Sequence, residues 1–159
     1  DKETGLLYWK KDSYIGFKKS VLSHKKGGLA KTFRKDGRGV VRLNGRLYLS
    51  YRIAWLLETG KWPDGEIDHK NGNSSDDSFK NLRDVSRVTN QENLINPFKS
   101  KKSSLFIGVY ANKKGRSKPW KSAITVNGKQ ISLGAFNTEE EAYAAYVSAK
   151  RILHLGCTI

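Results

Sequence analysis

A polar segment past the middle of the chain, residues 93–104, limits the folds that this sequence can adopt. The segment is rich in lysine and serine, and Pro97 ends any helix that enters it by Asn96. We therefore predict a linker at residues 97–104. The chain has 159 residues, so the part on each side of the linker has room for only one small hydrophobic core.

In the part before the linker, apolar residues recur first at the spacing of strands and then at the spacing of a helix. Residues 38–50 form two alternating runs joined by an Asn-Gly pair, which favours a two-residue hairpin turn. Residues 51–59 carry apolar side chains at helical spacing and are followed by a glycine, so we predict a short helix there. After a turn, residues 66–69 are predicted to form a strand.

The part after the linker predicts a sheet and a helix. Three alternating segments lie at residues 107–112, 120–126 and 129–133, and a second Asn-Gly pair joins the last two. Thr138 opens a helix with a capping-box pattern. The apolar stripe of this helix comprises Ala142, Ala145, Tyr146, Ala149, Ile152 and Leu153, and the inward face of the sheet comprises Val109, Trp120, Ser122, Ile124, Ile131 and Leu133. We predict that these two faces pack together.

The charge of the chain indicates a polyanionic partner. Thirty Lys and Arg residues face 15 Asp and Glu residues, which gives a net charge of +15. Residues 10–46 hold twelve basic and two acidic side chains, and residues 93–138 hold nine basic and none that is acidic. We therefore expect two nucleic-acid contact regions.

Other partners and compartments are disfavoured by the composition. No apolar run approaches the roughly 18–20 residues of a membrane span, and no signal-peptide pattern opens the chain. The single cysteine, Cys157, can form neither an internal disulfide nor a multi-cysteine zinc site. We expect a cytoplasmic protein that has no membrane attachment and no small-molecule cofactor.

A carboxylate beside an imidazole marks the candidate site. Asp68 and His69 lie in the sequence Ile-Asp-His-Lys-Asn-Gly, and Asn81 and Asn90 follow 12 and 21 residues after the histidine. Phosphodiester hydrolysis needs a base with a pKa near neutrality and a hard cation on the phosphate, for which histidine and carboxylate or amide oxygens are suited. By spacing alone, the same pair also fits an ordinary hydrogen-bonded turn.

The motifs of residues 48–96 resemble those of HNH endonucleases of the phage and intron-homing type. They are Arg-x-x-Trp at 52–55, Gly-x-Trp-Pro at 60–63, Ile-Asp-His-x-Asn-Gly at 67–72, Asn-Leu-Arg at 81–83 and Asn-x-x-Asn at 90–93. The resemblance implies a ββα unit around one Mg²⁺ or Mn²⁺ ion, with strands ending at residues 67–69 and beginning at 81–85 and a helix over 87–96. It would make His69 the general base, Asp68 and Asn90 the metal ligands, and Asn81 the residue that holds the histidine loop. Tyr51 stands where the family commonly has a histidine, and we interpret this position as structural.

Residues 103–159 resemble the AP2 DNA-binding domain through the motifs at 108–110, 118–124, 127–136 and 138–146. In that family the sheet lies in the major groove of DNA. The resemblance implies that the outward residues Tyr110, Asn112, Lys121, Ala123, Thr125, Gln130 and Ser132 contact bases and that Lys113, Lys114, Arg116 and Lys118 bind phosphates. AP2 domains commonly carry several arginines on the DNA-facing side of the sheet, and this sequence lacks them. We therefore expect its recognition of bases to differ from that of the family.

Together these patterns predict an α+β protein with a small ββα-metal nuclease module followed by a three-stranded antiparallel sheet packed on one helix. The expected divisions are a basic, β-rich region at 1–47, the nuclease at 48–96, the linker at 97–104 and the DNA-binding domain at 105–159. The predicted function is that of a phage-encoded, monomeric endonuclease that nicks or cuts double-stranded DNA. Two alternatives stay open: a DNA-binding protein without catalysis, and an enzyme that acts on RNA.

Overall fold

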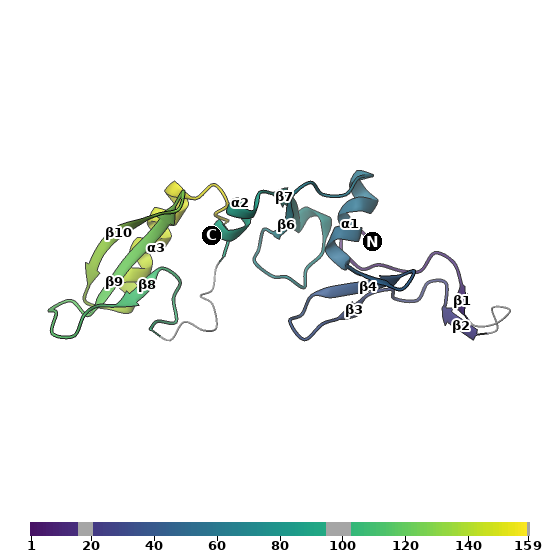
Figure 1. Cartoon of the computed structure of the whole chain (residues 1–159), viewed down its shortest axis with the longest axis horizontal. Coiled ribbons are helices and arrows are strands. Elements are labelled where there is room, and N and C mark those ends of the chain that lie inside the picture. Colours follow the sequence, from purple (N-terminus) through teal and green to yellow (C-terminus); the bar gives the residue numbers. More distant parts are fainter. Residues whose placement is uncertain (16–20, 95–102, 159) are drawn as a thin grey trace. The chain divides into compact units, whose positions relative to one another are not determined.

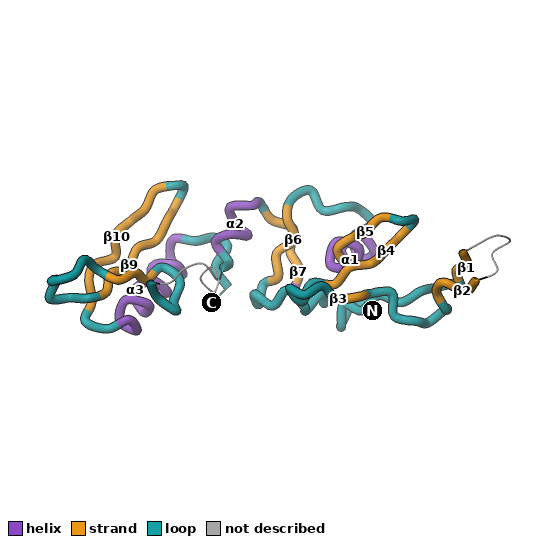
Figure 2. The backbone as a smooth tube through the Cα atoms, turned by 60° about the horizontal axis from the view of Figure 1, so that its bottom comes forward, coloured by secondary structure: helices purple, strands orange, loops and turns teal. Residues whose placement is uncertain are grey.

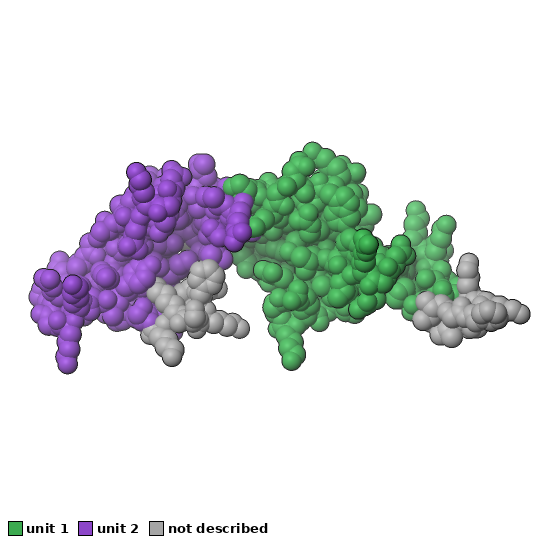
Figure 3. Space-filling model, in the orientation of Figure 1, with its two compact units in different colours: residues 1–86 green, residues 87–159 purple. Residues whose placement is uncertain are grey.

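The computed structural model describes residues 1–15, 21–94 and 103–158. It divides into two compact units, Asp1–Ser86 and Arg87–Ile159, which we call the first and the second unit (Figure 3). Most of the predicted linker, residues 97–102, lies outside the described residues. The domain boundaries expected from the sequence stay predictions.

The first unit begins with two small antiparallel sheets. Strand β1 (Ser13–Ile15) pairs with β2 (Val21–His24), and β3 (Thr32–Phe33), β4 (Gly39–Leu43) and β5 (Arg46–Leu49) form a sheet in that order. Asn44 and Gly45 connect β4 to β5 with φ angles of 47° and 79°. Positive φ at both central residues is what a type I′ hairpin turn requires, so the predicted hairpin is confirmed.

Helix α1 (Ser50–Thr59) follows directly and joins two hydrophobic clusters. Its Ile53 lies in a cluster with Leu7 and Val41, while its neighbour Ala54 lies in a second cluster with Ile67 and Leu82. The helix contacts β4 and β5 and lies beside them in Figure 2. It ends at Gly60, whose φ of 76° permits the left-handed turn that closes the helix.

A second hairpin carries the residues of the candidate site. Strands β6 (Glu66–His69) and β7 (Leu82–Val85) pair antiparallel, with Asp68 opposite Arg83 and His69 opposite Leu82. A short 3₁₀ helix, η2 (Phe79–Asn81), leads into β7. Since Ile67 and Leu82 are buried beside α1, the end of β6 is held against the core of the first unit.

The second unit opens with helix α2 (Arg87–Glu92). The sequence predicted a helix to residue 96, and this end was wrong. The N–H groups of Asn93 and Leu94 donate to the carbonyls of Asn90 and Gln91, three residues back. Such bonds tighten the last turn of a helix and end it.

The rest of the second unit is a three-stranded antiparallel sheet with one helix. Strands β8 (Val109–Ala111), β9 (Trp120–Val126) and β10 (Lys129–Phe136) are ordered β10-β9-β8, and α3 (Glu139–Leu153) contacts all three (Figure 1). Thr138 accepts a hydrogen bond from the N–H of Glu141, and the Glu141 side chain bonds back to the backbone of Thr138. The predicted sheet, helix and capping box are confirmed, while the relation to AP2 domains stays a prediction.

Three positions of the predicted core of this unit were wrong. Ile152 is 82% exposed, and Ile131 and Leu153 are exposed as well. Lys150 is completely buried instead, and its Nζ donates to the carbonyl of Leu94 at 2.6 Å. Lys150 therefore reaches the segment after α2, while Ile152 and Leu153 remain exposed, and Ile131 lies on the edge strand β10.

Candidate active site

Asp68 lies near the end of β6 and is fixed by a cross-strand ion pair. Both Nε and Nη2 of Arg83 donate to Oδ2 of Asp68 at 2.7 Å. The carboxylate is 6% exposed and the guanidinium 23% exposed. Because the two residues are opposite each other in the β6–β7 register, the hairpin itself sets the orientation of the carboxylate.

His69 is the last residue of β6 and is nearly buried. Its Nε2 lies 3.1 Å from Oδ1 of Asp77. The ring of Tyr51 meets the imidazole edge to face, with 5.2 Å between the centroids and 87° between the planes, a favourable arrangement for aromatic rings. Tyr51 therefore restrains the imidazole by packing, and burial raises the pKa of its phenol.

Asp77 connects His69 to a buried lysine. Lys31 Nζ donates to Asp77 Oδ2 at 2.7 Å, with side-chain exposures of 1% and 0%. Ser50 Oγ donates to the same oxygen. Burial alone would raise the pKa of Asp77, but the hydrogen bonds from His69, Lys31 and Ser50, together with the charge of Lys31, hold this pKa below its usual range.

Sequence reasoning missed these partners of His69. Lys31 was counted among the basic residues of the 10–46 region, yet its side chain is internal. It lies 46 positions before Asp77, and no periodicity connects residues at that separation. The one available signal was the Asp-Asp pair at residues 76–77, between the histidine and Asn81.

Asn81 closes the loop that follows His69. Its Oδ1 accepts a hydrogen bond from the N–H of Asn71 at 3.0 Å, and its Nδ2 donates to the carbonyl of Asp76 at 2.8 Å. The N–H of Lys70 donates to the backbone carbonyl of Asn81 at 2.8 Å. These bonds tie the loop to the start of β7, and the loop-holding role expected of Asn81 stays a prediction.

The fourth predicted site residue, Asn90, lies in the second unit. It is the fourth residue of α2, whereas Asp68, His69 and Asn81 belong to the first unit. Its role as a metal ligand therefore stays a prediction.

The site offers oxygen atoms that a hard divalent cation could use. Asp68 offers carboxylate oxygen in a fixed orientation, and Mg²⁺ takes one or two carboxylates while keeping several waters. Zinc sites need three or four nitrogen, sulfur or carboxylate ligands. Within residues 1–15, 21–94 and 103–158, no three His, Cys, Asp or Glu side chains gather to hold a metal ion.

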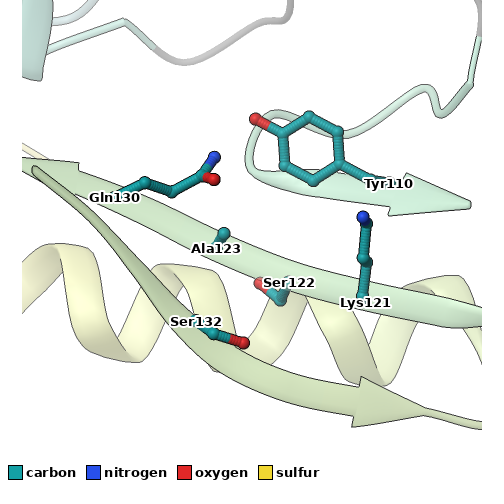
Figure 4. A pocket seen from close by; sticks show the side chains of 6 residues that line it. All are labelled: Tyr110, Lys121, Ser122, Ala123, Gln130 and Ser132. Carbon is teal, nitrogen blue, oxygen red and sulfur yellow. The ribbon is translucent and has the colours of Figure 1, made fainter. Parts of the chain in front are cut away.

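The predicted DNA contacts lie on the sheet of the second unit and on the loop that joins β8 to β9. A hollow of about 400 Å³ on the sheet is lined by Tyr110, Lys121, Ser122, Ala123, Gln130 and Ser132, and Figure 4 shows Tyr110, Ala123 and Gln130 on the side turned away from α3. Of the predicted contacts, Lys121, Thr125, Gln130 and Ser132 are exposed on the strands, and Lys113, Lys114, Arg116 and Lys118 are exposed on the β8–β9 loop. Eight basic or polar side chains are thus available to a partner.

Asn112 differs from the other predicted DNA contacts. Its Nδ2 donates to the carbonyl of Lys118 at 3.0 Å, and its Oδ1 accepts from the N–H of Lys113 at 2.9 Å. The amide therefore shapes the β8–β9 loop, so a DNA contact by Asn112 would have to compete with these bonds.

Comparison with known families identifies the module that holds the site. Residues 48–93 match the model of the HNH endonuclease family, and this match indicates nuclease activity for that part of the chain. The matched range includes Asp68, His69, Asn81 and Asn90. Comparisons with curated proteins and with solved structures gave no match to the chain. In the described part of the chain, no helix has the length and hydropathy that crossing a membrane would need.

Proposed function

We propose that the chain is a metal-dependent endonuclease of the phage or intron-homing type that hydrolyses phosphodiester bonds in double-stranded DNA. The observation that carries the proposal is the placement of Asp68 and His69 side by side at the end of β6, each fixed by a charged partner, within the residues that match the HNH endonuclease family.

In this proposal His69 is the general base. An imidazole accepts a proton through a ring nitrogen, and histidine is the side chain that most often serves as a general base. The contacts with Asp77 and Tyr51 restrict rotation of the ring, so little orientational freedom would have to be lost when DNA binds.

Asp68 would hold the Mg²⁺ or Mn²⁺ ion, with Asn90 as the second protein ligand expected from the resemblance. When bound, such an ion polarises the scissile phosphate and stabilises the leaving oxygen. Arg83 would keep the Asp68 carboxylate oriented for the ion. Asn81 would keep the loop after His69 closed around this site.

The second unit would supply affinity and orientation for DNA. Eight of the predicted contacts, four on the strands and four on the β8–β9 loop, are exposed. Basic side chains provide phosphate contacts that fix the register of a protein on the duplex, while Gln130 and Lys121 are of the types that read base edges in the major groove. A monomer with one HNH site would sever one strand for each binding event.

A DNA-binding protein without catalysis is the second candidate. The ion pair with Arg83 favours it, because Arg83 could keep Asp68 in a purely structural role. RNA as substrate would be detected by competition between duplex DNA and structured RNA.

Conversion of supercoiled plasmid tests the proposal. We expect nicking with Mg²⁺ or Mn²⁺, none with EDTA, and none for His69→Ala, while DNA binding measured in parallel persists in that variant. The matched control is His24→Ala, which alters a histidine stacked on Trp9 outside the site and should leave nicking intact. Binding without cutting in either metal would refute the nuclease and support the second candidate.

A further inference from the structure

The function proposed above uses Asp77 only to restrict rotation of the His69 ring, and it gives no role to the charges of Asp77 and Lys31. Asp77 is completely buried and carries a negative charge that Lys31 balances. A buried ion pair is costly to form and is not in itself evidence for stability. The position of this pair, with one carboxylate oxygen on Lys31 and the other 3.1 Å from the imidazole, indicates a role toward the histidine.

The network is tightly packed from distant parts of the first unit. Lys31 immediately precedes β3, Ser50 begins α1, and Asp77 lies in the loop before η2. A Cβ added to Gly39 would lie 2.2 Å from Ser50 Oγ and 2.3 Å from Lys31 Cε, and one added to Gly5 would lie 2.2 Å from the backbone carbonyl carbon of Asp77. Backbone therefore packs directly against the main chain of Asp77 and against the two side chains that bond its carboxylate, which keeps Asp77 in one place.

The hydrogen-bonding capacity of the groups fixes where the imidazole proton lies. An ionised carboxylate accepts hydrogen bonds but donates none, and a neutral imidazole carries a proton on one nitrogen only. Lys31 and Ser50 both donate to Asp77, as expected for an ionised carboxylate. The Nε2 of His69 must then donate to Asp77 Oδ1, which leaves the lone pair on Nδ1.

We propose that Asp77 is a positioning residue that holds His69 in the Nε2–H tautomer, so that Nδ1 is the atom that takes a proton from water. This inference rests on the proposed nuclease function. In the reaction, water gives its proton to Nδ1, the resulting hydroxide forms the new bond to phosphorus, the bond from phosphorus to the 3′ oxygen breaks, and the leaving oxygen takes a proton from solvent. Asp77 also stabilises the positive charge that His69 gains in this step, the role that a buried aspartate plays toward histidine in serine proteases.

Two variants test the proposal. In Lys31→Met/Asp77→Asn, both charges are removed together so that neither is left buried and unpaired. The matched control is Lys61→Met/Asp64→Asn, the same two substitutions at an ion pair that is 72% and 89% exposed.

The first readout is the tautomer of His69, measured by long-range ¹H–¹⁵N correlation on the labelled full chain. His69→Gln identifies the signals of His69 among those of the three histidines. We expect the Nε2–H form in the wild type and in the control, and a mixture of tautomers in Lys31→Met/Asp77→Asn. An Nδ1–H form in the wild type would overturn the proposal.

The second readout is plasmid nicking at saturating DNA. We expect the rate of Lys31→Met/Asp77→Asn to fall by about 10²- to 10⁴-fold, with DNA affinity unchanged and the control unaffected. A folded Lys31→Met/Asp77→Asn variant that nicks at the wild-type rate would overturn the proposal. If neither the wild type nor the control nicks DNA in either metal, the proposed nuclease function is refuted. The catalytic role of Asp77 is then refuted as well, even if the tautomer of His69 is the expected one.

Discussion

The buried Lys31–Asp77 pair leads to a stability prediction that is independent of catalysis. Replacing Lys31 with Met leaves the Asp77 carboxylate buried without its cation. Asp77→Asn likewise leaves the Lys31 ammonium group buried without its anion. Breaking a buried pair by removing one partner costs about 3–5 kcal/mol. At roughly 0.05–0.15 kcal/mol per residue, the first unit, Asp1–Ser86, would have about 4–13 kcal/mol in total. Each single variant should therefore lose a large part of the free energy of unfolding of this unit.

The double variant should be less destabilised than the sum of the single variants, because no unpaired charge remains. The resulting coupling energy should exceed about 2 kcal/mol, within the range measured for residues in one ion-pair network. Urea unfolding followed by tryptophan fluorescence measures it, since Trp9, Trp55 and Trp62 lie in the first unit. A Trp120→Phe background removes the signal of the second unit.

The exposed pair of Lys61 and Asp64, 3.9 Å apart, provides the comparison. The same substitutions there should change unfolding by no measurable amount, since exposed ion pairs contribute little. If Lys31→Met costs less than about 1 kcal/mol, or no more than Lys61→Met, the reasoning from burial is refuted.

Two further predictions concern pH and the second unit. The pKa of Asp77 is held below its ordinary value in the folded protein, so its contribution to stability is complete above about pH 4 and is lost as the pH falls through the folded-state pKa. The urea midpoint of the first unit should therefore drop on acidification. A midpoint that stays constant down to pH 2 would contradict this prediction. Gly156→Ala should lower the melting temperature of the second unit by several degrees, because the added Cβ would lie 2.0 Å from the carbonyl oxygen of Thr89. Calorimetry checks it, and an unchanged melting temperature of the second unit would contradict the prediction.

Much of the local structure follows from short stretches of sequence. The Asn44-Gly45 turn, the capping box of Thr138 and Glu141, and the limits of β6 and β9 all agree with prediction. Each depends on backbone conformations and hydrogen bonds between residues close together in the chain, and the sequence encodes these directly. The adjacency of Asp68 and His69 is of the same kind.

The environment of those two residues depends on the tertiary structure. Arg83 reaches Asp68 only because β6 and β7 pair in one register. Lys31 reaches Asp77 from 46 residues away, although composition alone assigned it to a basic surface. Likewise, the helical period placed Ile152 in the core and Lys150 outside it, and the structure reverses both.

The amino-acid sequence by itself thus determined which side chains could carry out chemistry and which short elements hold them, since both are properties of neighbouring residues. Only the tertiary structure decided which charges meet in the interior. Burial and ion pairing arise from contacts between segments that are far apart in the chain, and the free energy of such a contact depends on everything packed around it. The partners of His69 therefore became visible only when β3, α1 and the loop before η2 were seen to converge behind it.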